Sequence, residues 1–90
     1  MKADKNLVLR LLKTARGQIE GLIKMVEDDR YCIDISNQVL ATTSILKKIN
    51  LEILRGHFTH CVKNTLQNGT DADIDKSMDE ITGVLDKLIK

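Results

Sequence analysis

The fold of this 90-residue chain is decided by residues 31–69, YCIDISNQVLATTSILKKINLEILRGHFTHCVKNTLQNG. The stretch has no Pro and no turn-forming cluster before Asn68-Gly69, and only Gly56 interrupts its helical pattern. Its apolar residues recur at helical spacing, and they are Ile35, Val39, Leu46, Ile49, Ile53, Val62 and Leu66. The pattern favours one helix of about 35 residues, roughly 50 Å long, over two helices that meet at Gly56.

A shorter amphipathic helix is predicted before this stretch. Apolar residues recur at i, i+3 and i+4 steps over residues 7–26, and Asp4 is in position to cap the first turn. The polar cluster at residues 28–30 ends the pattern. Gly17 and Gly21 each cost about 1 kcal/mol relative to Ala inside a helix, so we expect them where a neighbouring helix approaches closely.

A third helix is predicted after Asn68-Gly69, which is a typical helix C-cap. Thr70 or Asp71 can cap it, and its apolar stripe consists of Ile74, Met78, Ile81, Leu85, Leu88 and Ile89. Strand-like alternation is sustained nowhere in the chain. The fold class is therefore all-α, with residues 1–90 forming a single domain: a three-helix protomer with one long central helix.

The composition indicates that this protomer needs a partner. The chain contains no Trp, no Pro and only 2% aromatic residues, so Leu, Ile, Val and Met must form its core. A monomer of this size buries only about 60–65% of its unfolded surface, and two shorter helices of one protomer cannot cover the long one. We therefore expect an antiparallel helical dimer.

The same composition limits the cellular setting. No apolar run approaches the roughly 18–20 residues of a membrane span, and the N-terminus lacks a signal-peptide pattern, so we expect a cytoplasmic protein without membrane contact. Two cysteines exclude a disulfide scaffold, and in the cytoplasm they suggest a metal-binding or redox role.

Charge is nearly balanced overall, at +1, but it is unevenly distributed. Residues 1–24 carry six basic and two acidic side chains, and residues 47–68 carry four basic and one acidic. A basic face built from these two segments would attract a polyanion such as DNA. The alternative is an ordinary solvated surface.

The cysteines and histidines suggest a shared metal site. His57 and Cys61 are four residues apart, which puts them on one helical face with Cβ atoms about 6 Å apart. Cys32 lies roughly 37 Å away along a continuous helix, so one protomer cannot bring all three together. An antiparallel partner that crosses near residue 45 can, and it would form two equivalent sites with two sulfurs and one nitrogen each. Such a ligand set suits trigonal Cu(I).

Other interpretations of these residues remain open at this point. Cys32 and Cys61 could instead form a thiol redox pair, or serve as small apolar residues without any site. An enzyme that uses either cysteine as a nucleophile is not indicated, because no pocket-forming or oxyanion feature is visible.

Three motifs resemble the copper-sensitive operon repressor family over roughly residues 7–69. They are RGQIEGL at residues 16–22, MVEDDRYCID at residues 25–34, and the ending His57-x-x-x-Cys61. Members of this family are bacterial and archaeal DNA-binding repressors. Their three-helix protomers pair into dimers and stack into dimer-of-dimers tetramers, and they have no classical helix-turn-helix reader.

The resemblance implies a specific site and function. Cys32 of one protomer would bind Cu(I) together with His57 and Cys61 of the other, and Tyr31 matches a position that supports these ligands. The metal-free homotetramer would hold double-stranded operator DNA, and copper would release it. The family's nickel, cobalt, formaldehyde and persulfide branches each change part of this ligand set, so its retention points to the copper branch.

The chain departs from the family pattern at two places. The acidic residue that copper members carry on the third helix aligns near Lys76 or Ser77, and Leu11 stands where many members have Arg. DNA binding is therefore expected to depend on four other basic residues, namely Arg10, Lys13, Arg16 and Lys48. Gly56, beside His57, and the contact between the site and the third helix are candidates for the mechanical link between metal and DNA.

The sequence thus predicts a Cu(I)-responsive repressor that is not an enzyme and that acts as a homodimer or homotetramer. One alternative is a repressor that senses persulfide or thiol oxidation through Cys32 and Cys61. The other is a helical copper-buffering module that does not bind DNA.

Overall fold

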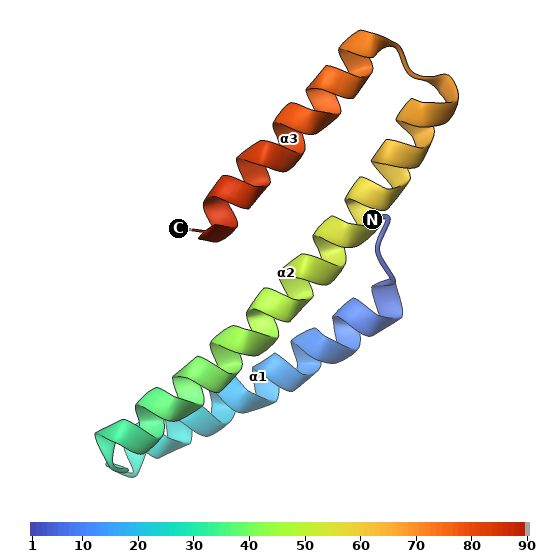
Figure 1. Ribbon diagram of the computed structural model, residues 1–90. Helices are drawn as coiled ribbons and strands as arrows, with labels where there is room; N and C mark the ends of the chain where they lie inside the picture. The colour runs from blue at the N-terminus through green and yellow to red at the C-terminus, as the bar shows by residue number, and fades with distance from the viewer. Residues whose placement is uncertain (90) are drawn as a thin grey trace.

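The computed structural model describes residues 1–89, which form three helices (Figure 1): α1 (Lys5–Glu27), α2 (Cys32–Asn68) and α3 (Asp71–Ile89). These residues contain no strand, so the all-α prediction is confirmed. α1 runs antiparallel along the first half of α2, and α3 folds back along the second half (Figure 1). The molecule measures 58 × 28 × 12 Å. Because its thickness is close to one helix diameter, the helices form a single layer.

The central helix α2 is continuous over 37 residues, as the sequence predicted. Gly56 lies inside it and does not break it. The helix ends at Gly69, whose N–H donates to the Thr65 carbonyl at 2.7 Å. This length gives α2 two well-separated ends, each of which carries residues of the predicted metal site.

Side-chain and backbone caps define the ends of α1. Asp4 accepts a hydrogen bond from the Leu7 N–H at 3.1 Å, as predicted for the N-cap. At the other end Asp29 adopts a left-handed conformation with a φ of 52°. The Arg30 N–H then reaches back to the Met25 carbonyl at 3.0 Å. This is the backbone pattern of a Schellman cap, with Asp in the position that Gly usually occupies.

A reciprocal capping box starts α3. The Thr70 N–H donates to the Asp73 carboxylate at 3.0 Å, and the Asp73 N–H donates to the Thr70 hydroxyl at 3.3 Å. Hydrogen bonding of the Asp73 carboxylate by Thr70, through the backbone N–H foremost and then through the side chain, lowers the pKa of Asp73 below its ordinary value. Of the two caps that the sequence allowed, Thr70 is the one used.

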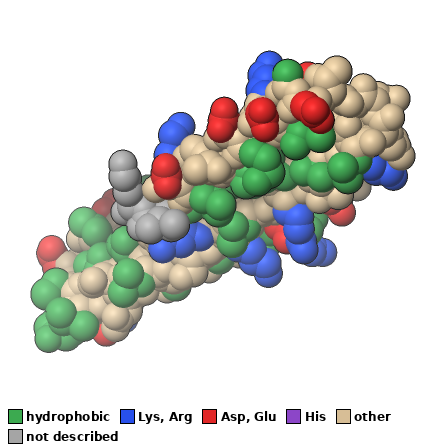
Figure 2. Space-filling model, turned by 45° about the horizontal axis from the view of Figure 1, so that its top comes forward, with side chains coloured by type: hydrophobic (Ala, Val, Ile, Leu, Met, Phe, Trp, Pro, Cys, Tyr) green, Lys and Arg blue, Asp and Glu red, His purple; other side chains and the backbone are tan. Residues whose placement is uncertain are grey.

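The buried core is small and lies between α1 and α2. Val8, Ala15 and Ile49 form it, and Thr42 is buried beside them, where its hydroxyl donates to the Gln18 side chain at 2.8 Å. Eighteen large hydrophobic side chains of the described residues are exposed, and Figure 2 shows several of them in patches on the surface. No helix among the described residues is long and apolar enough to cross a membrane. Apolar faces exposed over such an area are typical of interaction surfaces.

The glycines differ from the sequence prediction in one respect. No atom lies within 4 Å of the Cβ position of Gly17 or Gly21, so no other helix of this chain makes the close approach expected there. Gly56 is the crowded position, because a Cβ there would lie 2.5 Å from the Cα of Ala3. The N-terminal segment therefore crosses α2 at the residue next to His57.

Candidate metal centre

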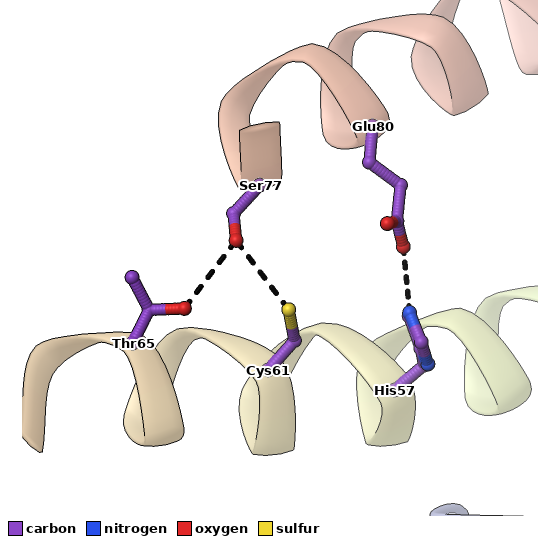
Figure 3. A network of polar contacts seen from close by, with 5 residues as sticks. All are labelled: His57, Cys61, Thr65, Ser77 and Glu80. Carbon is purple, nitrogen blue, oxygen red and sulfur yellow. Dashed lines mark hydrogen bonds and ion pairs between the residues drawn. The ribbon is translucent and has the colours of Figure 1, made fainter. Parts of the chain in front are cut away.

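Two of the predicted ligands lie one helical turn apart on α2 and face α3. His57 and Cys61 both extend from the same side of α2, and α3 runs opposite them (Figure 3). Cys61 is partly buried, and it borders an open hollow that also contains Lys76, Ser77 and Glu80. The hollow leaves one side of the sulfur accessible to a further ligand.

The His57 ring is held by Glu80 of α3. Its Nε2 lies 2.6 Å from the Glu80 carboxylate, and both side chains are about half exposed, at 51% and 44%. An ionised carboxylate can only accept a hydrogen bond, so Nε2 is the donor of this contact, and in a neutral ring Nδ1 then has the free lone pair. A carboxylate that fixes the second ring nitrogen is typical of metal-bound histidine. In this arrangement Nδ1 of a neutral His57 ring is the nitrogen available to a metal.

This contact corrects the expectation drawn from the alignment. The family's acidic position falls near Lys76 or Ser77, with Asp75, Asp79 and Glu80 nearby but unaligned, so no acidic residue was assigned to the site. Glu80, one turn further along α3, reaches His57 instead. The sequence could have indicated this contact. If two helices form a hairpin that turns at Gly69 and Thr70, residues at equal distances from the turn lie opposite one another, and their numbers sum to about 138.

Cys61 contacts the hydroxyl group of Ser77, which in turn contacts a second hydroxyl group, that of Thr65. Its Sγ lies 3.4 Å from the Ser77 Oγ, and the Thr65 Oγ1 lies 3.4 Å from that same oxygen (Figure 3). α3 therefore contacts both candidate ligands of α2, through Glu80 at His57 and through Ser77 at Cys61. Reasoning from the sequence missed both contacts, although the hairpin pairing predicts each of them.

The third candidate ligand, Cys32, is at the opposite end of α2. It is exposed and opens the helix. At 100° per residue, His57 and Cys61 each lie within about 20° of Cys32 around the axis. All three therefore lie on one line along the helix, yet Cys32 and His57 are separated by roughly 37 Å. Among residues 1–89, no group of three His, Cys, Asp or Glu side chains lies close enough to hold a metal.

Tyr31 precedes Cys32 at the same distant end. Its backbone caps α2, and its side chain is 65% exposed and makes no capping hydrogen bond. Within one chain it therefore does not reach His57.

The four basic residues predicted to bind DNA are all exposed, and none takes part in an ion pair within residues 1–89. Arg10 and Lys13 border the same shallow surface on α1, and Arg16 lies further along that helix. Lys48 lies on α2, nine residues before His57, which is about 180° away around the axis. A DNA contact at Lys48 would therefore be on the opposite side of α2 from the metal ligands.

Comparison with known proteins places the chain in a family. A family model described as metal-sensitive transcriptional repressor matches residues 4–87. The chain belongs to this family. Its members are transcriptional repressors, which act on DNA and are not enzymes.

Relatives described as copper-sensing repressors match most of the chain, and a solved structure matches its fold. The copper-sensing transcriptional repressor CsoR of Bacillus subtilis is 34% identical over 97% of this chain and 83% of that protein. RicR of Mycobacterium tuberculosis, also a copper-sensing transcriptional repressor, is 31% identical over 97% of this chain and 90% of its own length. The crystal structure of CsoR with Cu(I) from Geobacillus thermodenitrificans matches with a TM-score of 0.83 and 32% identity, covering 100% of this chain and 94% of that one.

Proposed function

We propose that this protein is a Cu(I)-responsive transcriptional repressor whose metal-free form binds operator DNA and whose copper-bound form releases it. The observation that carries the proposal is the alignment of Cys32, His57 and Cys61 along one face of a continuous helix. Two thiolates and an imidazole form a soft ligand set that suits Cu(I). Similar proteins named as copper sensors support this choice of metal.

An antiparallel homodimer would complete the site. If two α2 helices pair in opposite directions, Cys32 of each lies against His57 and Cys61 of the other, and the two-fold axis gives two equivalent sites. Val39 and Leu46 lie between the ligands on the same side of α2 and are exposed in the single chain. Both are already more than half covered in the single chain, so burying the remainder contributes about 1 kcal/mol each, and the dimer also covers the apolar face that one protomer leaves open.

Binding would reach the DNA surface indirectly. Lys48 faces away from the ligands, so a metal at His57 and Cys61 does not block it. The elements that a bound metal would disturb are the two ligands and α3, which contacts both of them through Glu80 and Ser77. We therefore expect an allosteric mechanism with a coupling free energy of about 1–3 kcal/mol or more.

Contacts with DNA would come mainly from phosphate-binding side chains. Arg10, Lys13, Arg16 and Lys48 are exposed and form no ion pair within residues 1–89, and stacking two dimers into a tetramer would multiply them over one surface. The resemblance to a family without a classical helix-turn-helix reader implies that DNA shape would contribute to selectivity. A repressor of this kind acts in the cytoplasm, where its operator is.

The decisive experiment measures operator binding with and without Cu(I) at several salt concentrations. We expect the metal-free protein to bind, the affinity to fall steeply with salt, and one Cu(I) per protomer to weaken binding. Absence of DNA binding by the metal-free protein at low salt would refute the repressor, and would leave a copper-buffering module.

Two histidine variants separate copper from sulfur chemistry. His57→Ala should lose much of the Cu(I) affinity, while His60→Ala is the matched control, because His60 borders the hollow beside the N-terminal segment instead of α3. A thiol redox sensor that uses Cys32 and Cys61 would keep its response in both variants. Loss of affinity in His57→Ala alone supports the copper site.

A further inference from the structure

The hydroxyl groups near Cys61 do not follow the pattern of most other helical hydroxyl groups among the described residues. Helical Ser and Thr usually donate to the carbonyl four residues before them, and Thr14, Thr43 and Thr82 do so here at 2.9–3.0 Å. Thr65 and Ser77 instead contact each other across the gap between α2 and α3, and Ser77 continues to the Cys61 sulfur. This series of contacts, from Thr65 through Ser77, ends on a candidate metal ligand.

The chemistry of the Cys61 sulfur determines which group donates each of these hydrogen bonds. In the free thiol, either the sulfur or the Ser77 oxygen can donate. A sulfur bound to a metal has no hydrogen, so Ser77 must then donate its O–H to Cys61. The Ser77 oxygen still has lone pairs, and Thr65 can donate into them. Both hydroxyl groups are thus satisfied when the metal is bound.

We propose that Ser77 is a positioning residue that donates a hydrogen bond to the Cys61 sulfur of the copper-bound protein, with Thr65 fixing the Ser77 hydroxyl in that orientation. The inference rests on the proposed Cu(I) site. Hydrogen bonds to a metal-bound sulfur hold it in place and lower its donor strength. Ser77 would therefore set both the affinity for Cu(I) and the electronic character of the Cu–S bond.

The test removes this one hydroxyl and reads the metal directly. Removing a partner of a metal ligand typically costs 10–100-fold in affinity. Because Cys61 is only partly buried, we expect Ser77→Ala to lower the Cu(I) affinity about tenfold, at the low end of that range. Competition with a chromophoric Cu(I) chelator measures it. The near-UV Cu–S charge-transfer band should also move to longer wavelength, since an unbonded sulfur holds its electrons less tightly.

Two further variants make the result specific. Thr82→Ala removes a hydroxyl from the same helix that bonds only to its own Met78 carbonyl, so affinity and band should match the wild type. Ser77→Thr should restore both, because a hollow lined by Val62 and Leu66 lies beside Ser77 and has room for the extra methyl group. Thr65→Val should shift the band in the same direction as Ser77→Ala, by a smaller amount.

The outcomes separate this inference from the proposed function. If the wild type shows no Cu–S band, the copper site itself is wrong. If the wild type binds Cu(I) and Ser77→Ala has the same affinity and the same band, the role of Ser77 is overturned. If circular dichroism shows that Ser77→Ala folds poorly, the Cu–S band of the other two variants tests the role of Ser77. An unshifted band in Thr65→Val would then overturn that role, whereas a shift to longer wavelength in Thr65→Val with a wild-type band in Ser77→Thr would support it.

Discussion

Replacing Gly56 by Ala should free the N-terminal segment without unfolding the protein. The Cα of Ala3 lies 2.5 Å from the position that a Cβ at Gly56 would occupy, and the Ala3 nitrogen and Cβ lie 2.8 Å from it. These are backbone and near-backbone atoms, so no side-chain rotation relieves the clash. Ordinary contact begins near 3.4 Å, so the segment must move by about 1 Å or leave the helix.

The two free-energy terms nearly cancel. Ala in place of Gly inside a helix stabilises it by about 1 kcal/mol. Against this, Ala3 packs beside the core of Val8, Ala15 and Ile49, and losing one methyl group from such a contact costs about 0.8 kcal/mol. The free energy of unfolding of Gly56→Ala should therefore stay within about 1 kcal/mol of the wild type.

The informative assay is local. Amide hydrogen exchange or NMR contacts should show residues 1–4 detached from α2 in Gly56→Ala, with α2 itself intact. Gly17→Ala is the matched control: its Cβ position is open within the chain, so the N-terminal segment should stay in place. The reasoning is refuted if the contacts between Ala3 and α2 persist unchanged in Gly56→Ala, or if the variant loses several kcal/mol of stability.

Three further predictions concern α3 and the turn before α2. Glu80→Gln should weaken Cu(I) binding about 10–100-fold in a chelator competition, whereas Asp79→Asn, a neighbouring change of the same charge, should not. Because the Thr70 hydrogen bonds lower the pKa of Asp73, their stabilisation is present above the ordinary pKa of 3.8 and is lost as the pH falls through the lower folded value. An acid titration followed by circular dichroism should therefore show a smaller loss of helix in Asp73→Asn. Gly adopts the left-handed conformation of residue 29 at a lower conformational free energy than Asp, by up to about 1 kcal/mol. Asp29→Gly should therefore raise the melting temperature, and an unchanged or lower melting temperature would contradict this.

The long helix was predictable because its evidence is local. No Pro or turn cluster interrupts residues 32–68, and the residues that end the helices, at Gly69 and around Asp29, are visible in the sequence. The contacts of the site were harder to predict, because they depend on the pairing between helices. Glu80 and Ser77 lie 23 and 16 residues from the ligands that they contact, and no spacing rule within one helix connects such residues. Only the position of the turn at Gly69 fixes which residues of α3 lie opposite α2.

The requirement for two chains can be tested by mixing variants that are each inactive. Cys32→Ala lacks one half of every site, and the double variant His57→Ala, Cys61→Ala lacks the other half, so neither homodimer should bind Cu(I) with high affinity. In a mixed dimer, one of the two sites regains a full ligand set and the other loses all its ligands. After equal amounts are unfolded together and refolded, half of the dimers are mixed, so about a quarter of the wild-type copper capacity should return. A site built within one chain would give no recovery on mixing, because each protomer would still lack its own ligands. Recovery near a quarter would therefore show that the copper site is shared between protomers, and that binding copper and forming the dimer are energetically linked.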